Sequence, residues 1–132
     1  MSDDIKQPEP LLFGHMLAFM YLTFAHYTDG EVTKEEMATV SIKIGEWMDE
    51  GDDGSSTVSE TIDWYNSVKS VRLDVFDYML TRFKNMTQWN DKLLTSVLDD
   101  LVSIAKADGN YDDREKKWIR MFAAAFELDY KV

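Results

Sequence analysis

The sequence predicts an all-α fold, a compact single-domain bundle of about six to seven helices. Apolar residues recur at spacings of three and four along most of the chain, which is the period of a helix packed on one face. No stretch of useful length alternates with the period of a strand. The length of 132 residues suits one domain, and a hydrophobic content of 45% is sufficient for a folded core.

The beginning of the chain is predicted to hold a flexible N-terminal arm and the first helix. Residues 1–10 contain both prolines and several charged groups, so we expect an arm that ends at Pro10. The helix that follows, to about Tyr27, is apolar nearly all round, which is typical of a helix surrounded by others. The helical domain then covers residues 11–130.

A second helix is expected after a turn at Thr28–Glu31. Thr33 is its predicted N-cap, and Glu36, three residues later, completes the pattern of a capping box. The apolar residues that follow keep the helical period, and we expect this helix to end near Glu50.

The middle of the chain combines a polar loop with one or two helices. Gly51–Ser56 is the stretch richest in glycine and polar residues, and it is predicted to be a mobile loop. A helix is expected to start at Thr57, with Glu60 in capping-box register. It either continues or breaks near Ser70, and the segment closes at Asn85–Thr87.

The last two helices are predicted to form a hairpin. One spans about Gln88–Ala107, and a turn at Asp108–Tyr111 follows it. Asp112 is the predicted N-cap of the final helix, and Glu115 stands at the matching third position. The apolar face of that helix is made by Trp118, Ile119, Phe122 and Phe126.

The two ends of the sequence align when the chain is shifted by 79 residues. Asp29-Gly30 then falls on Asp108-Gly109, and Glu36 falls on Glu115. Each copy is a helix, an Asp-Gly turn, a cap and a second helix. This repetition predicts two pseudo-symmetric helical hairpins in one core.

The Asp-Gly turns are also candidate metal sites. Side-chain oxygens fall at positions 1, 3, 5 and 8 of each copy. Oxygen ligands favour hard cations, so Ca²⁺ or Mg²⁺ is expected here more than Zn²⁺. The glycine stands at position 2 and no glutamate stands at position 12, so neither copy is an EF-hand loop. Helix capping explains the same residues without metal, and both interpretations stay open. The candidate metal ligands are Asp29, Glu36, Asp108 and Glu115.

The composition restricts the partners and the compartment. A formal net charge of −11 disfavours nucleic acid and anionic membrane surfaces. The apolar run Leu11–Ala25 is too short to span a bilayer, so no membrane insertion is expected. The acidic N-terminus is unlike a signal peptide, and the absence of cysteine fits a reducing compartment. We therefore expect a cytoplasmic protein.

No pattern in the chain predicts an enzyme. There is no nucleophile elbow, phosphate loop or His-Glu-x-x-His motif. The two histidines, His15 and His26, are separated by about three helical turns, roughly 16 Å, which is too far for one metal ion. His26 precedes Asp29 by three residues and could join a site there, although a histidine with a hydrogen-bond partner is the commoner case. The acidic segment Asp49–Asp53 is interpreted as a solvated loop.

The two Asp-Gly segments resemble those of the TerB-like tellurite-resistance family. The matching segments are Ala25–Glu36 and Ala105–Glu115, and the resemblance extends over about residues 11–128. It implies a compact helical bundle with two-fold pseudo-symmetry, related to the N-terminal domain of a DnaJ-like co-chaperone. It also implies acidic clusters for divalent metal at Asp29, Glu36, Asp108 and Glu115, and a role in stress-linked assemblies.

Two hypotheses about function follow. In the first, the chain is a non-catalytic binding module that takes up a divalent cation at one or both turns and organises a surface for a protein partner, in tellurite resistance or a stress response. In the second, it is a metal-free helical scaffold for protein–protein interaction. The sequence does not name the protein partner and leaves homo-oligomer formation open.

Overall fold

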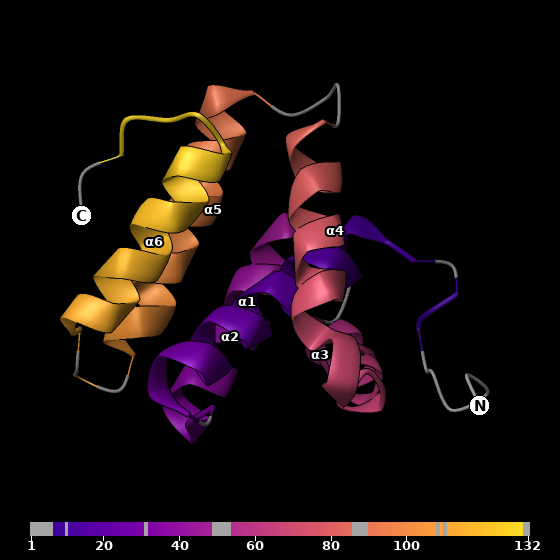
Figure 1. Ribbon diagram of the computed structural model, residues 1–132. Coiled ribbons are helices and arrows are strands. Elements are labelled where there is room, and N and C mark those ends of the chain that lie inside the picture. The colour runs from indigo at the N-terminus through magenta and orange to yellow at the C-terminus, as the bar shows by residue number, and fades with distance from the viewer. Residues whose placement is uncertain are drawn as a thin grey trace.

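The computed structural model describes residues 7–9, 11–30, 32–48, 54–85, 90–107, 109 and 111–130. Within these ranges the chain forms helices and no strand, which confirms the all-α prediction (Figure 1). The elements are α1 (Phe13–Asp29), α2 (Lys34–Trp47), α3 (Gly54–Ser67), the 3-10 helix η2 (Lys69–Val71), α4 (Arg72–Lys84), α5 (Asp91–Lys106) and α6 (Asp113–Ala125).

Helix α1 is the centre of the bundle. It packs against each of the other five α-helices, and Figure 1 shows α5 and α6 on one side of it and α3 and α4 on the other. Every side chain from Met16 to Ala25 is at most 2% exposed. Because burial on all faces requires an apolar sequence on all faces, the prediction of a surrounded first helix is confirmed.

The start of α1 depends on His15, whose role as a capping residue was not predicted. The backbone N–H of Leu12, the N-cap residue, donates to Nδ1 of His15 at 3.1 Å, so the histidine at the third helical position accepts the hydrogen bond that a capping glutamate usually accepts. The helix begins at Phe13. Of the predicted flexible arm, residues 1–6 and 10 lie outside the described residues, and Pro8 is buried.

The predicted loop at 51–56 and the predicted start of a helix at Thr57 need correction. Residues 54–56 already belong to α3, while 51–53, and with them the acidic segment 49–53, lie outside the described residues. Thr57 is therefore inside the helix, and its Oγ1 donates to Sδ of Met48 at 3.5 Å instead of capping. The predicted partner of that cap, Glu60, contacts Nε2 of His15 at 3.1 Å.

Gly54 stands at a close crossing of two helices, not in a loop. A Cβ at this position would lie 2.6 Å from the carbonyl oxygen of Ser41 and 2.8 Å from the backbone nitrogen of Gly45. Only glycine allows α3 to approach the backbone of α2 this closely. The composition of the segment predicted a loop because glycine is common both in loops and at close crossings of two helices. Helix α2 itself ends at Trp47, and the predicted end at Glu50 lies outside the described residues.

The helical segment in the middle of the chain breaks, as one of the two alternatives predicted. Val68 and Val71 have non-helical backbone angles (φ −115°, ψ 31° and φ −127°, ψ 21°), and η2 lies between α3 and α4. The hydroxyl of Ser67 donates to the carbonyl of Trp64 at 2.7 Å, which competes with continuation of the helix. After the break, α4 packs against α1.

Helices α4, α5 and α6 complete the core. Asn90 caps α5 by accepting from the N–H of Leu93 at 3.0 Å, and the predicted start at Gln88 lies outside the described residues, as does most of the predicted closure at 85–87. The ring of Phe122 packs edge-on against Phe24 and Phe76. The described part of the chain contains no helix with the length and hydrophobicity needed to cross a bilayer.

Candidate functional site

Both Asp-Gly turns end a helix with a glycine in the left-handed region. Gly30 has φ 82° and donates its N–H to the carbonyl of His26 at 2.8 Å. Gly109 has φ 83° and donates to the carbonyl of Lys106 at 3.0 Å. Residues with a Cβ are strained at such angles, so the glycines are needed to turn the chain.

The predicted capping boxes that follow the two Asp-Gly turns are confirmed. Thr33 Oγ1 accepts from the N–H of Glu36 at 3.1 Å, and Oε1 of Glu36 accepts from the N–H of Thr33 at 3.0 Å. At α6, Asp112 Oδ1 accepts from the N–H of Glu115 at 3.0 Å, and Oε1 of Glu115 accepts from the N–H of Asp112 at 2.9 Å. Two separate hairpins therefore start their second helix in the same way.

The burial of the two capping glutamates was not predicted. Glu36 and Glu115 are both 0% exposed, although a capping box requires only that the side chain reach back to its own helix start. Glutamate is rarely fully buried unless it is paired, because removing a carboxylate from water is unfavourable. Each turn therefore has an acidic group at its base, inside the protein.

The two turns lie at the same end of the bundle. Nη1 of Arg114, in the first turn of α6, donates to the carbonyl oxygen of Thr28, near the end of α1, at 3.1 Å. Figure 1 shows the α1–α2 and α5–α6 connections at one end of the molecule. Segments 79 residues apart in the sequence are thus neighbours, although the pseudo-symmetric relation of the hairpins stays a prediction.

The structure describes the side chains of only two of the four predicted metal ligands. Asp108 and the side chain of Asp29 lie outside the described residues, whereas Glu36 and Glu115 stand at the bases of the two turns. Among the residues that are described, no group of three or more histidine, aspartate or glutamate side chains could hold a metal ion. The metal site at the four acidic residues stays a prediction.

Both histidines have hydrogen-bond partners. His15 is described above, and Nδ1 of His26 lies 2.7 Å from the hydroxyl of Tyr65. Burial, and next the positive charge of Arg72, lower the pKa of His26 below its ordinary value of 6.5. His26 is thus part of a cluster with α3 and α4.

A buried carboxylate that joins the two hairpins escaped the sequence analysis. Oδ2 of Asp100 accepts from the hydroxyl of Tyr21 and from Nε1 of Trp47, both at 2.7 Å. Burial raises the pKa of Asp100, and these two hydrogen bonds oppose that rise. Tyr21 and Asp100 are 79 residues apart, which is the offset of the repeat, so the repeat contained a signal for this contact.

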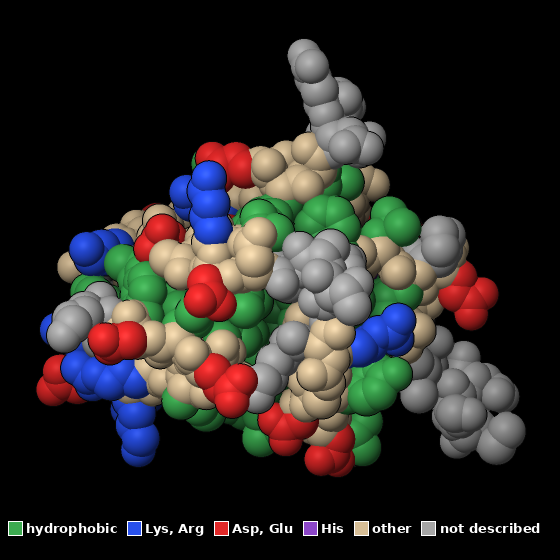
Figure 2. All heavy atoms as spheres, turned by 90° about the horizontal axis from the view of Figure 1, so that it is seen from above, with side chains coloured by type: hydrophobic (Ala, Val, Ile, Leu, Met, Phe, Trp, Pro, Cys, Tyr) green, Lys and Arg blue, Asp and Glu red, His purple; other side chains and the backbone are tan. Residues whose placement is uncertain are grey.

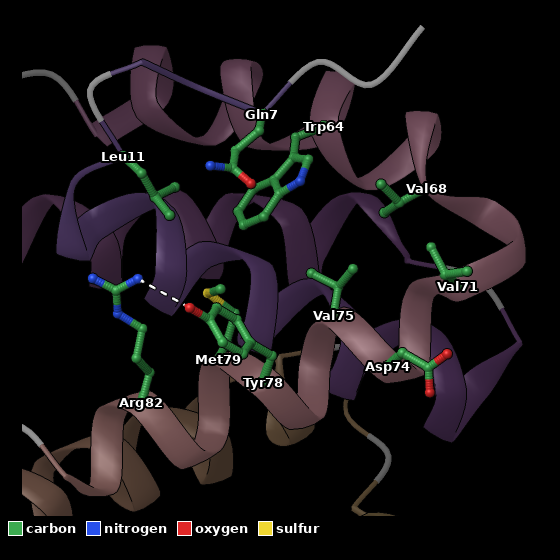
Figure 3. A pocket seen from close by; sticks show the side chains of 10 residues that line it. All are labelled: Gln7, Leu11, Trp64, Val68, Val71, Asp74, Val75, Tyr78, Met79 and Arg82. Carbon is green, nitrogen blue, oxygen red and sulfur yellow. Dashed lines mark hydrogen bonds between the residues drawn. The ribbon is translucent and has the colours of Figure 1, made fainter. Parts of the chain in front are cut away.

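The surface carries an apolar groove of about 440 Å³ beside α4. Figure 3 shows Leu11 and Trp64 facing the side chains of α4, and Arg82 donating to the hydroxyl of Tyr78 at 3.4 Å. Tyr78 is 58% exposed. Figure 2 likewise shows apolar side chains on the surface between acidic ones, so this face of the molecule carries both apolar and acidic surface.

These features define a class of protein: a small helical module with two Asp-Gly hairpins whose capping glutamates are buried at one end of the bundle. The chain belongs to the TerB family, described as "Tellurite resistance protein TerB", whose profile matches residues 16–131. No curated protein and no solved structure matches the chain.

Proposed function

We propose that this chain is a non-catalytic binding module of the TerB family that takes up a divalent cation, Ca²⁺ or Mg²⁺, at the end of the bundle where its Asp-Gly turns lie. The ligands would come from Asp29, Glu36, Asp108 and Glu115. The bound cation would organise this end as a surface for a protein partner, in tellurite resistance or a related stress response. Family membership supports the context.

The observation that carries the proposal is the burial of both capping glutamates. Capping alone leaves such a side chain free to stay at the surface, yet Glu36 and Glu115 are fully buried. A divalent cation at the turn would stabilise a buried carboxylate by direct attraction in a region of low dielectric.

The chemistry of the donors fits a hard cation. All four proposed side chains are carboxylates, which Ca²⁺ and Mg²⁺ prefer, and neither cysteine nor a group of histidines is present to favour Zn²⁺. One oxygen of each glutamate accepts a capping N–H, which fixes the orientation of the carboxylate. A net charge of −11 attracts cations further.

Calorimetric titration of Ca²⁺, Mg²⁺, Mn²⁺ and Zn²⁺ into chelator-treated protein tests the proposal. We expect saturable heat with Ca²⁺ or Mg²⁺ and a higher melting temperature, because a ligand that binds only the folded state stabilises it. The absence of both heat and melting shift at millimolar metal would contradict metal binding.

The variants Glu36→Gln and Glu115→Gln separate metal binding from capping. Glutamine supports a capping box as glutamate does, so the helix start is kept and the metal-free stability should change by no more than about 1 kcal/mol. Loss of the negative charge should weaken the metal titration strongly. Thr33→Ala, which damages the cap and keeps the carboxylate, is the matched control and should reduce stability by about 1 kcal/mol with metal affinity retained.

The apolar groove favours the second function, a metal-free scaffold for protein–protein interaction. Val71 and Tyr78 in its lining are 42% and 58% exposed, and a contiguous apolar surface of this kind is typical of a site for a protein partner. A photo-reactive amino acid placed at Tyr78 should then crosslink to a partner protein in cells. The same group at Lys117, an exposed residue of α6, is the control.

Crosslinking from position 78 that persists in the Glu36→Gln and Glu115→Gln variants would support the scaffold. Crosslinking that disappears in these variants would instead connect partner binding to the metal end of the bundle. Equal crosslinking from positions 78 and 117 would contradict a specific role of the groove.

A further inference from the structure

Arg72 is a buried cation in the part of the fold where α1, α3 and α4 meet. The residue is only 8% exposed, and its Nε donates to the carbonyl oxygen of Tyr65 at 3.2 Å. The guanidinium carbon lies 3.8 Å from the centroid of the Tyr65 ring, a cation–π contact. No carboxylate among the described residues forms an ion pair with it.

His26 adds a second polar group beside this guanidinium. Nη1 of Arg72 lies 3.4 Å from Nδ1 of His26, and the hydroxyl of Tyr65 lies 2.7 Å from the same nitrogen. Since arginine can only donate, Nδ1 accepts, and the neutral ring keeps its proton on Nε2. The cluster thus presents N–H donors and a positive charge.

The cluster borders a pocket of about 300 Å³ next to the first Asp-Gly turn. Its polar lining includes His26, Tyr65, Asn66 and Arg72. Its apolar walls come from α1, α3, and α2 with the residues just before it, namely Leu22, Ile62, Val32 and Met37. A volume of this size is at the lower end of small-molecule sites, which commonly combine apolar walls with a few convergent polar groups.

We propose that this pocket binds a small anion, whose carboxylate or oxyanion oxygens accept hydrogen bonds from the guanidinium of Arg72. The site goes beyond the metal-dependent function proposed above and is independent of it. Nε and Nη1 of Arg72 contact Tyr65 and His26, and the guanidinium also forms a side-chain hydrogen bond with Tyr65, which leaves two of its five N–H donors for a ligand. A buried guanidinium needs a complementary negative charge, and its planar fork suits the paired oxygens of a carboxylate or oxyanion.

The walls of the pocket indicate which anions fit. Four apolar side chains would contact a short hydrocarbon body, which favours a small organic carboxylate. Inorganic oxyanions such as phosphate or tellurite share the recognised chemistry but gain nothing from the apolar walls. Butanoate, inorganic phosphate and tellurite are therefore the three probes that distinguish the sources of the anionic group.

The two histidines of the chain provide an internal control in the wild-type protein. Each probe is titrated while the imidazole proton resonances are recorded by NMR. An anion beside Arg72 offsets the positive charge that lowers the pKa of His26, so this pKa should rise on saturation. The imidazole resonances of His15, about three turns away on α1, should not move when the anion binds. Saturable binding with this pattern supports the proposal for whichever probe produces it.

Variants connect the effect to the guanidinium. Arg72→Gln should lower the affinity for the anion by about tenfold or more, the range for loss of a charged hydrogen bond. Arg120→Gln removes the same charge from an exposed position on α6 and should leave the affinity unchanged. Should Arg72→Gln fail to fold, the wild-type titration decides alone. No saturable shift of His26 with any probe, or equal shifts of both histidines, would overturn the proposal.

Discussion

The two Asp-Gly hairpins share their local geometry and differ in their surroundings. Gly30 and Gly109 have nearly the same φ, 82° and 83°, and both hairpins continue into a capping box with a fully buried glutamate. Beside the first turn lie His26 and the guanidinium of Arg72. Beside the second lies the ring of Tyr111.

The ring of Tyr111 has Lys106 and Lys116 within 5.3 and 5.2 Å of its centroid. These two cation–π contacts lie nearer the surface than the Arg72 cluster, since Tyr111 is only partly buried. The comparison shows that one local motif can be placed in two chemical environments. We expect the hairpins to respond equally to changes in the motif and differently to changes in the packing around it.

The largest effect is expected where the first hairpin crosses α3. Gly54→Ala would place a Cβ 2.6 Å from the carbonyl oxygen of Ser41, so the helices must separate, and we expect a loss of about 3 kcal/mol of unfolding free energy. Chemical denaturation measures this loss.

Gly45→Ala is the matched control at the same crossing. Apart from the backbone of its own helix and its two chain neighbours, no described atom lies within 4 Å of a Cβ at Gly45, so alanine should increase stability by up to about 1 kcal/mol through its higher helix propensity. Equal destabilisation by both variants would mean that the crossing is not as close as described.

The next effect concerns Asp100, which joins the second hairpin to the first. Asp100→Leu leaves the donors of Tyr21 and Trp47 without their acceptor and should destabilise by about 2 kcal/mol. Both donors share Oδ2, so the single carbonyl oxygen of Asp100→Asn can accept both. Asparagine also removes a buried charge, and this variant should be at least as stable as the wild type at neutral pH.

The pH dependence of the Asp100→Asn difference has a definite sign. Burial raises the pKa of Asp100 in the folded state above its ordinary value of 3.8. The contribution of Asp100 to the free energy of unfolding is therefore fully present below pH 3.8, and it is lost as the pH rises through the folded-state pKa. The advantage of Asp100→Asn should therefore grow as pH rises through that range. An advantage that shrinks instead would contradict the raised pKa.

The smallest effect tests the likeness of the two turns directly. Gly30→Ala and Gly109→Ala should each lose about 1 kcal/mol, because both place a Cβ in the left-handed region where no neighbouring atom adds a clash. Asparagine, which tolerates this region better, should lose less at both positions. Thermal melts that differ clearly between the two alanine variants would show that the turns are not equivalent.

Predictions from the sequence succeeded where the controlling interaction spans a few residues. The boxes formed by Thr33 with Glu36 and by Asp112 with Glu115 were correctly placed, because donor and acceptor are three residues apart. The same reasoning failed at Thr57, where the cap pattern is present but Gly54 packs on α2 and extends the helix backwards. A local pattern is overridden when a distant backbone makes a better contact.

The candidate site was predictable to a smaller extent than the fold. The repeat identified the four acidic residues, and two of them, Glu36 and Glu115, are described at the bases of the turns. Their complete burial could not be predicted, since capping patterns look the same on a surface helix and on a buried one. Arg72 was missed because its partners, Tyr65 and His26, come from two other helices.

The sequence by itself determined the helical class, the two Asp-Gly turns and the capping boxes at the starts of α2 and α6, because each follows from periodicity or from contacts within one helical turn. The tertiary structure alone decided that both turns lie at one end, tied by Arg114 to the carbonyl of Thr28 across 86 residues. It also decided that a carboxylate at Asp100 and a guanidinium at Arg72 are buried. The reason is that burial and charge environment depend on residues far apart in the chain, whose meeting no local pattern encodes.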